Sequence, residues 1–356
     1  MPLIVQHSFG APGSGGPIGA LERLMSSSLS ERYTFVRLHQ DGANGAIDVR
    51  RLREWRSRLR DIQPDLVHVR GLGNEGFHGV LAARMARCPR VLVSVHGTVR
   101  DLQSASTIKR TVLTKALEPA TLAMASHITT VCEFAAERPF IARHTAKLVG
   151  PMINGVQRRE NDAAARAQVR EELGLGSTDT AILSVGRLSV EKGHRDLARA
   201  LADLAPPQLE QVVLVLVGDG PDKSEILARY AAVEGLRVRA LGQRLDVSRL
   251  LQGGDIFAFP SWHENLSNAL LEAMAAGLPV VATRVGGNTE VLLKGGGLLV
   301  PAHDPKAVAT AIGSLIDSPE VRARLGAEAR SVVGANYSME RMVEVMDEIY
   351  QSVLSR

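Results

Sequence analysis

The chain has 356 residues, of which 45% are hydrophobic and 22% are charged. This length exceeds what one hydrophobic core normally serves, so we expect two domains, and the composition excludes a disordered or low-complexity protein. Aromatic residues make up only 4% of the chain, which argues against a stacking platform for single-stranded nucleic acid.

The net charge of +4 is unevenly distributed along the chain. Residues 1–150 contain 20 Lys and Arg against 12 Asp and Glu, which gives +8, whereas residues 151–356 contain 22 against 26, which gives −4. The two halves are therefore expected to meet different partners. Two cysteines, Cys88 and Cys132, cannot build a disulfide framework or a zinc site, and we interpret them as packing thiols in a reducing compartment.

No apolar run reaches the roughly 18 to 20 residues that a membrane-spanning helix requires. The first residues, "MPLIVQHSFG", contain a short apolar run without a basic leader. The expected location is therefore cytoplasmic.

Short apolar runs bounded by turn residues recur in the first half of the chain, a pattern typical of buried parallel strands. Helical stretches such as "GALERLMSSSL" and "VRRLREWRSRLRDI" separate them. This alternation predicts a parallel sheet covered by helices on both faces. The expected strands are residues 3–7, 33–38, 66–70, 91–97 and 127–132.

A polar, Ala- and Arg-rich segment then interrupts the alternation and is typical of a connector with a short helix. A second alternating series follows, with expected strands at residues 181–188, 211–220, 236–242, 255–261 and 279–287. The fold class is therefore α/β, with two doubly wound domains whose carboxyl strand ends bind ligands. The expected divisions are a first domain (1–155), a connector (156–178), a second domain (179–338) and a C-terminal helix (339–356), for which packing on the first domain is one option.

Two glutamates, Glu264 and Glu272, flank the start of a predicted helix over residues 268–276. Either Asn265 or Ser267 can cap this helix. Glu264 then lies in the loop between strand and helix, and Glu272 lies just over one turn into the helix. The space between the two carboxylates suits a sugar nucleotide.

The start of that helix is also suited to phosphate. The backbone amides of Leu266, Ser267 and Asn268 should point outward, where free amides and the helix dipole bind anions without a metal. A loop after an earlier strand, "GRLSVEKGH", adds Arg187 and Lys192, two cations that can bind a diphosphate. Glycines at both ends of this loop, Gly186 among them, allow it to bend.

Other nucleotide and metal motifs are absent from the sequence. The glycine-rich segment 10–20 lacks the G-x-G-x-x-G order and has no Walker lysine after it. There is no D-x-D, H-E-x-x-H or G-x-S-x-G motif. We therefore expect a site that needs no metal and no cofactor.

Taken in order, the motifs resemble those of the GT-B glycosyltransferases of family 4, the retaining group with an E-x7-E motif, which reads Glu264-NLSNALL-Glu272 here. The resemblance covers nearly the whole chain, from the Gly15-Gly16 loop through "VSVHGT", "SHITTVCEF", "INGV", "SVGRLSVEKG" and "LVGDGP" to "LLEAMAAGLPVVATRVGGNTEVL". It implies a GT-B fold with two Rossmann-like domains facing a central cleft.

The resemblance also implies roles for single residues. Glu272 would accept the ribose hydroxyls of a nucleotide-sugar donor, Glu264 would hold the transferred sugar, and Arg187 and Lys192 would neutralise the diphosphate. His96 would face the sugar, with a capping or core histidine as the alternative. The further implied donor contacts are Gly15, Gly16, Gly186, Gly242, Gln243, Leu245, Asn265, Leu266, Ser267 and Asn268.

One stretch departs from the family pattern. Many relatives have Gly-Phe-Gly after the first glutamate, whereas this chain has Asn265-Leu266-Ser267. The departure concerns the fit around the ring hydroxyls of the sugar, to which Asn268 could add a contact.

The implied activity is retaining transfer from a UDP- or GDP-sugar to a hydroxyl acceptor in envelope polysaccharide, lipopolysaccharide or glycolipid synthesis. The alternatives are a soluble secondary metabolite as acceptor, or a non-catalytic sugar-nucleotide-binding protein. A phosphorylase would need a pyridoxal-binding lysine and a longer chain, and an epimerase lacks this combination of motifs.

The basic first half also suggests a contact with anionic membrane. Residues 49–62 predict an amphipathic helix with an apolar stripe of Leu52, Trp55, Leu59 and Ile62 among six arginines. The stripe can pack on the sheet with the arginines merely solvated. Alternatively, the basic face attaches the protein peripherally to a membrane that carries a lipid-linked acceptor. No nucleic-acid partner is expected.

Overall fold

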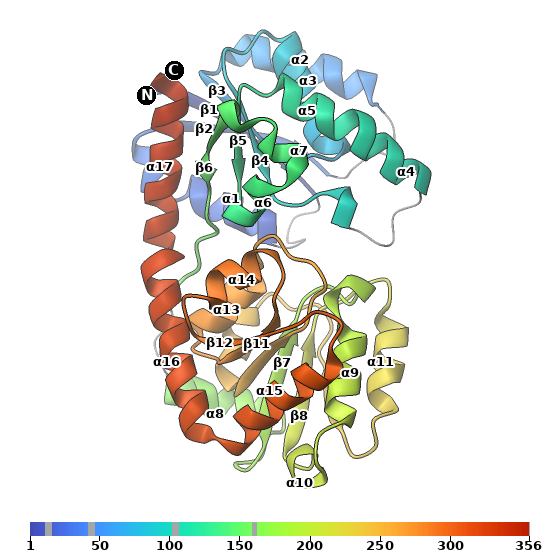
Figure 1. Cartoon of the computed structure of the whole chain (residues 1–356). Helices are drawn as coiled ribbons and strands as arrows, with labels where there is room; N and C mark the ends of the chain where they lie inside the picture. The colour runs from blue at the N-terminus through green and yellow to red at the C-terminus, as the bar shows by residue number, and fades with distance from the viewer. Residues whose placement is uncertain (11–15, 42–46, 102–106, 159–161, 356) are drawn as a thin grey trace. The chain divides into compact units, whose positions relative to one another are not determined.

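The computed structural model describes residues 1–10, 16–41, 47–101, 107–158 and 162–355 (Figure 1). The chain divides into two compact units, Met1–Gly155 with Glu340–Arg356, and Val156–Met339. Each unit contains a six-stranded sheet in which every described strand pair is parallel. The expected α/β class with two doubly wound domains is confirmed.

The first sheet has the strand order β2-β1-β3-β4-β5-β6. Its strands are β1 (Leu3–Phe9), β2 (Thr34–Gln40), β3 (Leu66–Arg70), β4 (Val91–Val95), β5 (His127–Thr130) and β6 (Leu148–Pro151). Its helices are α1 (Gly16–Met25), α2 (Val49–Ile62), α3 (Asn74–Met85), α4 (Thr107–Val112), α5 (Glu118–Met124), α6 (Glu133–Glu137), α7 (Pro139–Ala142) and α17 (Met339–Ser355). Helices α2, α3 and α5 lie on one face of this sheet, and α1 and α17 lie on the other (Figure 1).

Helix α2 packs as its apolar pattern predicts. Asp48 caps its start, and Leu52, Trp55 and Leu59 are buried in one apolar cluster with residues of β1, β2, β3 and β4. The stripe is therefore part of the core of the first unit. Arginines on the opposite side of the helix remain exposed, namely Arg50, Arg53, Arg58 and Arg60.

Helix α17 belongs to the first unit although it follows the second in sequence. One side of the helix is buried through Met342, Met346, Ile349, Tyr350 and Val353, and Tyr350 is fully buried. The segment Glu340–Arg356 brings two basic and four acidic residues, so the net charge of the first unit falls from +8 to +6.

The second sheet has the strand order β12-β11-β10-β7-β8-β9. Its strands are β7 (Thr180–Val185), β8 (Val212–Val217), β9 (Arg237–Ala240), β10 (Ile256–Phe259), β11 (Val280–Thr283) and β12 (Gly297–Val300). Its helices are α8 (Ala163–Glu172), α9 (His194–Ala202), α10 (Pro206–Leu209), α11 (Lys223–Ala231), α12 (Val247–Leu250), α13 (Asn268–Ala275), α14 (Gly286–Leu292), α15 (Pro305–Asp317) and α16 (Pro319–Asn336). Helices α9, α11 and α15 cover one face, where their apolar residues form a core with the strands (Figure 1).

Two strands were not predicted, and both lie at a sheet edge. β6 and β12 are each four residues long and pair with only one neighbour, so most of their side chains are partly exposed. Such strands lack the continuous apolar run by which central strands are recognised. Neither cysteine forms a disulfide and both are buried, which confirms their interpretation as packing thiols.

Helix α8 lies in the segment that the sequence indicated as a connector, and the structure packs it into the second unit. Val169 is fully buried, and a Cβ on Gly253 would lie 2.6 Å from its Cγ1 atom. Arg166 and Arg170 both bond the carboxylate of Asp255, which directly precedes β10. The helix therefore covers the amino ends of the strands.

Candidate functional site

The candidate site lies at the topological switch point of the second sheet. The chain proceeds from β7 to β8 and β9 on one side, then crosses to β10, β11 and β12 on the other. The loops that leave the carboxyl ends of β7 and β10 therefore begin side by side and then diverge, which is where doubly wound sheets bind ligands. These two loops carry Arg187 and Lys192 on one side, and Glu264 on the other.

Gly193 and Trp262 hold the two loops together. Gly193 has φ 70°, and a Cβ there would lie 1.8 Å from the carbonyl oxygen of Pro260, so no other residue fits without moving the backbone. The amide of Trp262 donates to the carbonyl of Glu191 at 2.8 Å, and its indole donates to Asp196 at 2.6 Å. Trp262 was not predicted, because its only signal in the sequence is its position two residues before Glu264.

The tight contact between the loops pairs two of the predicted site residues. The ammonium of Lys192 donates to the Oε1 atom of Glu264 and lies 5.4 Å from the ring centroid of Phe259. Glu264 is 9% exposed. The pair places a carboxylate and an ammonium together at the switch point, where the carboxylate can accept from a sugar hydroxyl and the ammonium can face a phosphate.

Arg187 lies in the same loop but in a different environment. Its side chain is exposed and makes no hydrogen bond or ion pair with any described residue. Its backbone is fixed, because Gly186 and Leu188 donate to the carbonyls of Val217 and Asp219, both at 3.0 Å. The guanidinium is thus available to an anion near the carboxyl end of β7.

The start of α13 presents free backbone donors. Ser267 is the N-cap and its hydroxyl accepts from the amide of Leu270 at 3.3 Å, which decides between the two predicted caps. Among the described residues, no acceptor takes a hydrogen bond from the amides of residues 266–268. Three free amides at a helix start are a ready site for an anion.

The α13 loop is also fixed by close contact with α14. A Cβ on Gly287 would lie 1.7 Å from the carbonyl oxygen of Asn265, so the glycine allows this approach. Asn265 and Ser267 are buried, whereas Leu266 and Asn268 are partly exposed. Glu272, one turn into α13, is half-buried. The helix therefore holds Glu272 on rigid backbone, while Glu264 lies in the loop that precedes it.

The segment from Gly242 to Leu245 follows β9. Gly242 has φ 66° and its carbonyl accepts from the amide of Gly218 at 2.8 Å. Gln243 is exposed, and Leu245 is 87% exposed. An apolar side chain held in water at the edge of the sheet could cover a flat ring such as a nucleobase.

The remaining predicted residues belong to the first unit. Gly15 lies outside the described residues, and Gly16 begins α1. His96 follows β4, is partly exposed, and lies 3.2 Å from the hydroxyl oxygen of Ser94 through its Nε2 atom. Burial of the ring and the nearby charge of Arg70 lower the pKa of His96 to about 3, so the imidazole is neutral at pH 7.

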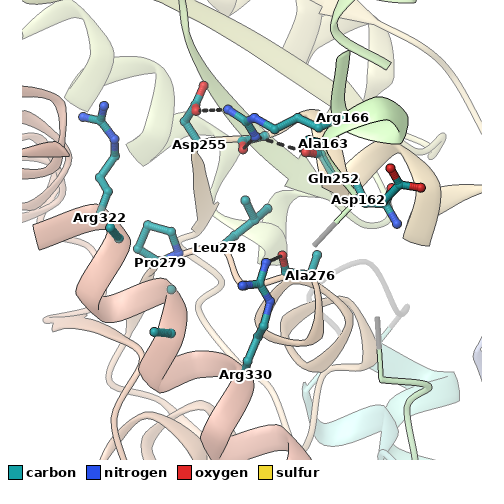
Figure 2. Close-up of a pocket in the computed structure, with 15 residues that line it drawn as sticks. Asp162, Ala163, Arg166, Gln252, Asp255, Ala276, Leu278, Pro279, Arg322 and Arg330 are labelled. Atoms are coloured by element: carbon teal, nitrogen blue, oxygen red, sulfur yellow. Dashed lines mark hydrogen bonds and ion pairs between the residues drawn. The ribbon is translucent and has the colours of Figure 1, made fainter. Parts of the chain in front are cut away.

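A cavity of about 520 Å³ lies at the opposite end of the second sheet, lined by α8, α16 and the residues before β10 and β11 (Figure 2). Figure 2 shows Arg166 directed at Asp255 and Arg330 directed at the carbonyl of Ala276. The Nη2 atom of Arg166 donates to Oδ1 of Asp255 at 2.5 Å, and Nη2 of Arg330 donates to the carbonyl oxygen of Ala276 at 2.7 Å. These arginines thus join helices to the amino edge of the sheet. None of the predicted site residues lines this cavity.

Within the described ranges, no group of three or more His, Cys, Asp or Glu side chains is arranged to hold a metal ion. The same residues include no helix of sufficient length and apolar character to cross a bilayer.

Two family models match separate parts of the chain. Residues 179–318 match the family model described as Glycosyl transferases group 1, and residues 17–139 match the Glycosyl transferase 4-like domain. Each of these two parts of the chain is therefore similar to a domain found in glycosyl transferases.

Two curated proteins illustrate what the chain is similar to. The chain is 35% identical over 201 residues to D-inositol 3-phosphate glycosyltransferase of Xylanimonas cellulosilytica, covering 55% of this chain and 48% of that protein. It is 32% identical over 190 residues to N-acetyl-alpha-D-glucosaminyl L-malate synthase of Bacillus anthracis, covering 52% and 49%. The chain thus spans about half the length of these curated relatives.

Among solved structures, HepE of Anabaena in complex with UDP and glucose has the same fold. The TM-score is 0.80 at 18% identity, over 99% of this chain and 100% of that one.

Proposed function

We propose that the chain transfers a sugar from a nucleotide-diphosphate sugar, UDP- or GDP-linked, to a hydroxyl acceptor with retention of anomeric configuration. The observation that carries this proposal is the group at the switch point of the second sheet. There, Lys192 and Arg187, the free amides of α13, and the carboxylate of Glu264 come from adjoining loops. A diphosphate matches the cations and amides, and a sugar matches the carboxylate.

The reaction requires no protein nucleophile in this proposal. The bond between the anomeric carbon and the diphosphate oxygen breaks, and the acceptor oxygen bonds that carbon on the same face. The proton of the acceptor hydroxyl passes to the leaving diphosphate. Arg187, Lys192 and the amides of residues 266–268 stabilise the charge that grows on the diphosphate, Glu264 positions the sugar, and Glu272 accepts the ribose hydroxyls.

The related proteins support the proposal without deciding the substrates. HepE is in complex with UDP and glucose, which favours a uridine donor. The two curated relatives carry an inositol phosphate and malate in their names, which favours the alternative of a small soluble acceptor over an envelope glycan or glycolipid.

The test is a thermal-shift panel of UDP-, GDP-, ADP- and dTDP-sugars, followed by a transfer assay with the sugar that stabilises best. One nucleotide should raise the melting temperature, because a ligand that binds only the folded state stabilises it. Transfer or donor hydrolysis above a no-enzyme control supports an enzyme. Binding with neither reaction would instead identify a non-catalytic sugar-nucleotide-binding protein, and no binding at all would refute both readings.

Activity should be unchanged by EDTA. The groups that stabilise the diphosphate in this proposal are two cationic side chains and neutral backbone amides, so removing divalent metal takes away no part of that stabilisation. Initial rates are compared after dialysis against EDTA and after return of Mg²⁺ or Mn²⁺. A rate that falls on dialysis and recovers with metal would contradict a metal-independent site.

We also propose peripheral attachment of the first unit to anionic membrane through the exposed arginines of α2. The apolar stripe of that helix is buried, so attachment would be electrostatic, with each basic residue near the surface contributing about 1 kcal/mol. Sedimentation with anionic vesicles should occur at low salt, weaken steeply as salt rises, and diminish when Arg50, Arg53 and Arg60 become glutamine. Protein that stays in the supernatant at low salt would favour a soluble acceptor.

A further inference from the structure

A second switch point lies in the first sheet. The chain passes from β1 to β2 on one side and then crosses to β3 on the other side of β1. The switch point therefore lies between β1 and β3. Arg70 is the last residue of β3, at the carboxyl edge where such sheets bind ligands, and it is 4% exposed. Its guanidinium crosses to β1, where it donates to the Oε1 atom of Gln6 at 2.8 Å and to the carbonyl of His7 at 3.3 Å.

The charge of Arg70 has no counter-ion. Its partners, Gln6, the carbonyl of His7 and the hydroxyl of Tyr350, are all neutral, and no carboxylate among the described residues lies within 4.0 Å of it. The stretches of the first unit outside the described residues, 11–15, 42–46 and 102–106, contain no Asp or Glu. An unpaired buried charge costs several kcal/mol, and buried charges are normally paired for that reason.

The groups around Arg70 do not offset its charge. Burial and the charge of Arg70 lower the pKa values of His7, His68 and His96, so these imidazoles are neutral at pH 7. Arg37 on β2 is close enough to lower the pKa of Arg70 further. The carboxyl edge of β1 and β3 is therefore positive, with neutral rings around it.

A purely structural role explains the arrangement less well. Gln6 is already fixed by Tyr350 of α17, since its Nε2 atom donates to the tyrosine hydroxyl at 2.8 Å. The same hydroxyl lies 3.0 Å from Nδ1 of His68. A neutral amide in place of Arg70 could bond Gln6 without burying a charge.

We propose that Arg70 is the cationic floor of an anion site on the first unit, which receives a phosphate or carboxylate group of the sugar acceptor. The assignment of this anion to the sugar acceptor rests on the proposed function. In that function the diphosphate of the donor already has its cations and amides in the second unit, so the charge of Arg70 is left for a different anion.

The test follows His96 by NMR while inorganic phosphate is added to the full-length protein, without UDP and then with saturating UDP. Phosphate beside Arg70 should raise the pKa of His96, because it offsets the positive charge that depresses that pKa. Arg70→Gln should weaken phosphate binding by about tenfold to a hundredfold, as expected for a lost charge-assisted hydrogen bond. Arg70→Lys should retain part of the affinity.

Two variants separate binding from folding. Tyr350→Phe removes the hydroxyl that bonds both Gln6 and Arg70 but keeps the charge of Arg70, so it should lower the melting temperature while phosphate still binds. Arg87→Gln removes an exposed arginine that lies outside α2, and it should change neither property. If Arg70→Gln does not fold, the wild-type titration still decides, because His96 unaffected by phosphate would overturn the proposal.

The remaining outcomes are equally decisive. Phosphate affinity lost in Tyr350→Phe as fully as in Arg70→Gln would assign Arg70 a structural role. Phosphate that competes with UDP, together with weaker UDP binding by Arg70→Gln, would assign the charge to the donor diphosphate and overturn the acceptor. Failure to bind UDP would count against the proposed function alone, since the response of His96 to phosphate without UDP is measured independently.

Discussion

Lys192→Gln should lower kcat by about a hundredfold or more while the donor KM changes little, because the ammonium acts on charge that develops only as the diphosphate leaves. The structure adds a second reason. Lys192 is paired with Glu264, which is 9% exposed, so the substitution leaves a buried carboxylate unpaired close to the expected position of the diphosphate. Steady-state kinetics over a range of donor concentrations measure both constants.

Arg187→Gln removes the other cation of the site and is compared with Lys192→Gln. Arg187 is exposed and leaves no carboxylate behind, so its loss should lower kcat in the same way without lowering the melting temperature. Arg324→Gln is the control, because it removes an exposed arginine paired with Glu328 on α16. A Lys192 variant as active as this control would exclude the assigned role, as would equal losses of affinity for nucleoside mono- and diphosphate.

Glu272→Gln should weaken donor binding by about 2 to 3 kcal/mol, the range for a hydrogen bond to a charged group, which corresponds to roughly 30- to 160-fold. The substitution keeps the size of the side chain and removes the charge that favours the ribose hydroxyls as donors. Because Glu272 lies on α13 and is half-buried, its position is fixed before the ligand arrives. Calorimetric titration with UDP or the preferred nucleotide measures the change.

Glu320→Gln is the matched control for Glu272→Gln, since Glu320 is an exposed glutamate in the first turn of α16. It should bind the nucleotide as the wild type does. Unchanged affinity in Glu272→Gln would remove the residue from the donor site, and a lower melting temperature in Glu272→Gln alone would assign it a role in folding.

The central strands and the start of α13 could be predicted because their signals are local. A strand covered on both faces, such as β8, is a continuous apolar run, and Ser267 is a capping residue directly before the helix that it begins. β6 and β12 escaped prediction because an edge strand is only half covered and leaves no such run. Tyr350 escaped because its burial depends on polar partners in β1 and β3, which lie far from it in sequence.

The sequence by itself determined the α/β class and the residues of the two loops, because the periodicity of burial and the turn residues record local structure directly. Only the tertiary structure decided that Lys192 pairs with Glu264 and that the charge of Arg70 lies beside Gln6. The physical reason is that both contacts depend on which strands are neighbours. The crossovers from β9 to β10 and from β2 to β3 place β10 beside β7 and β3 beside β1. Those crossovers are set by how whole helices and strands pack, and no short stretch of sequence contains that information.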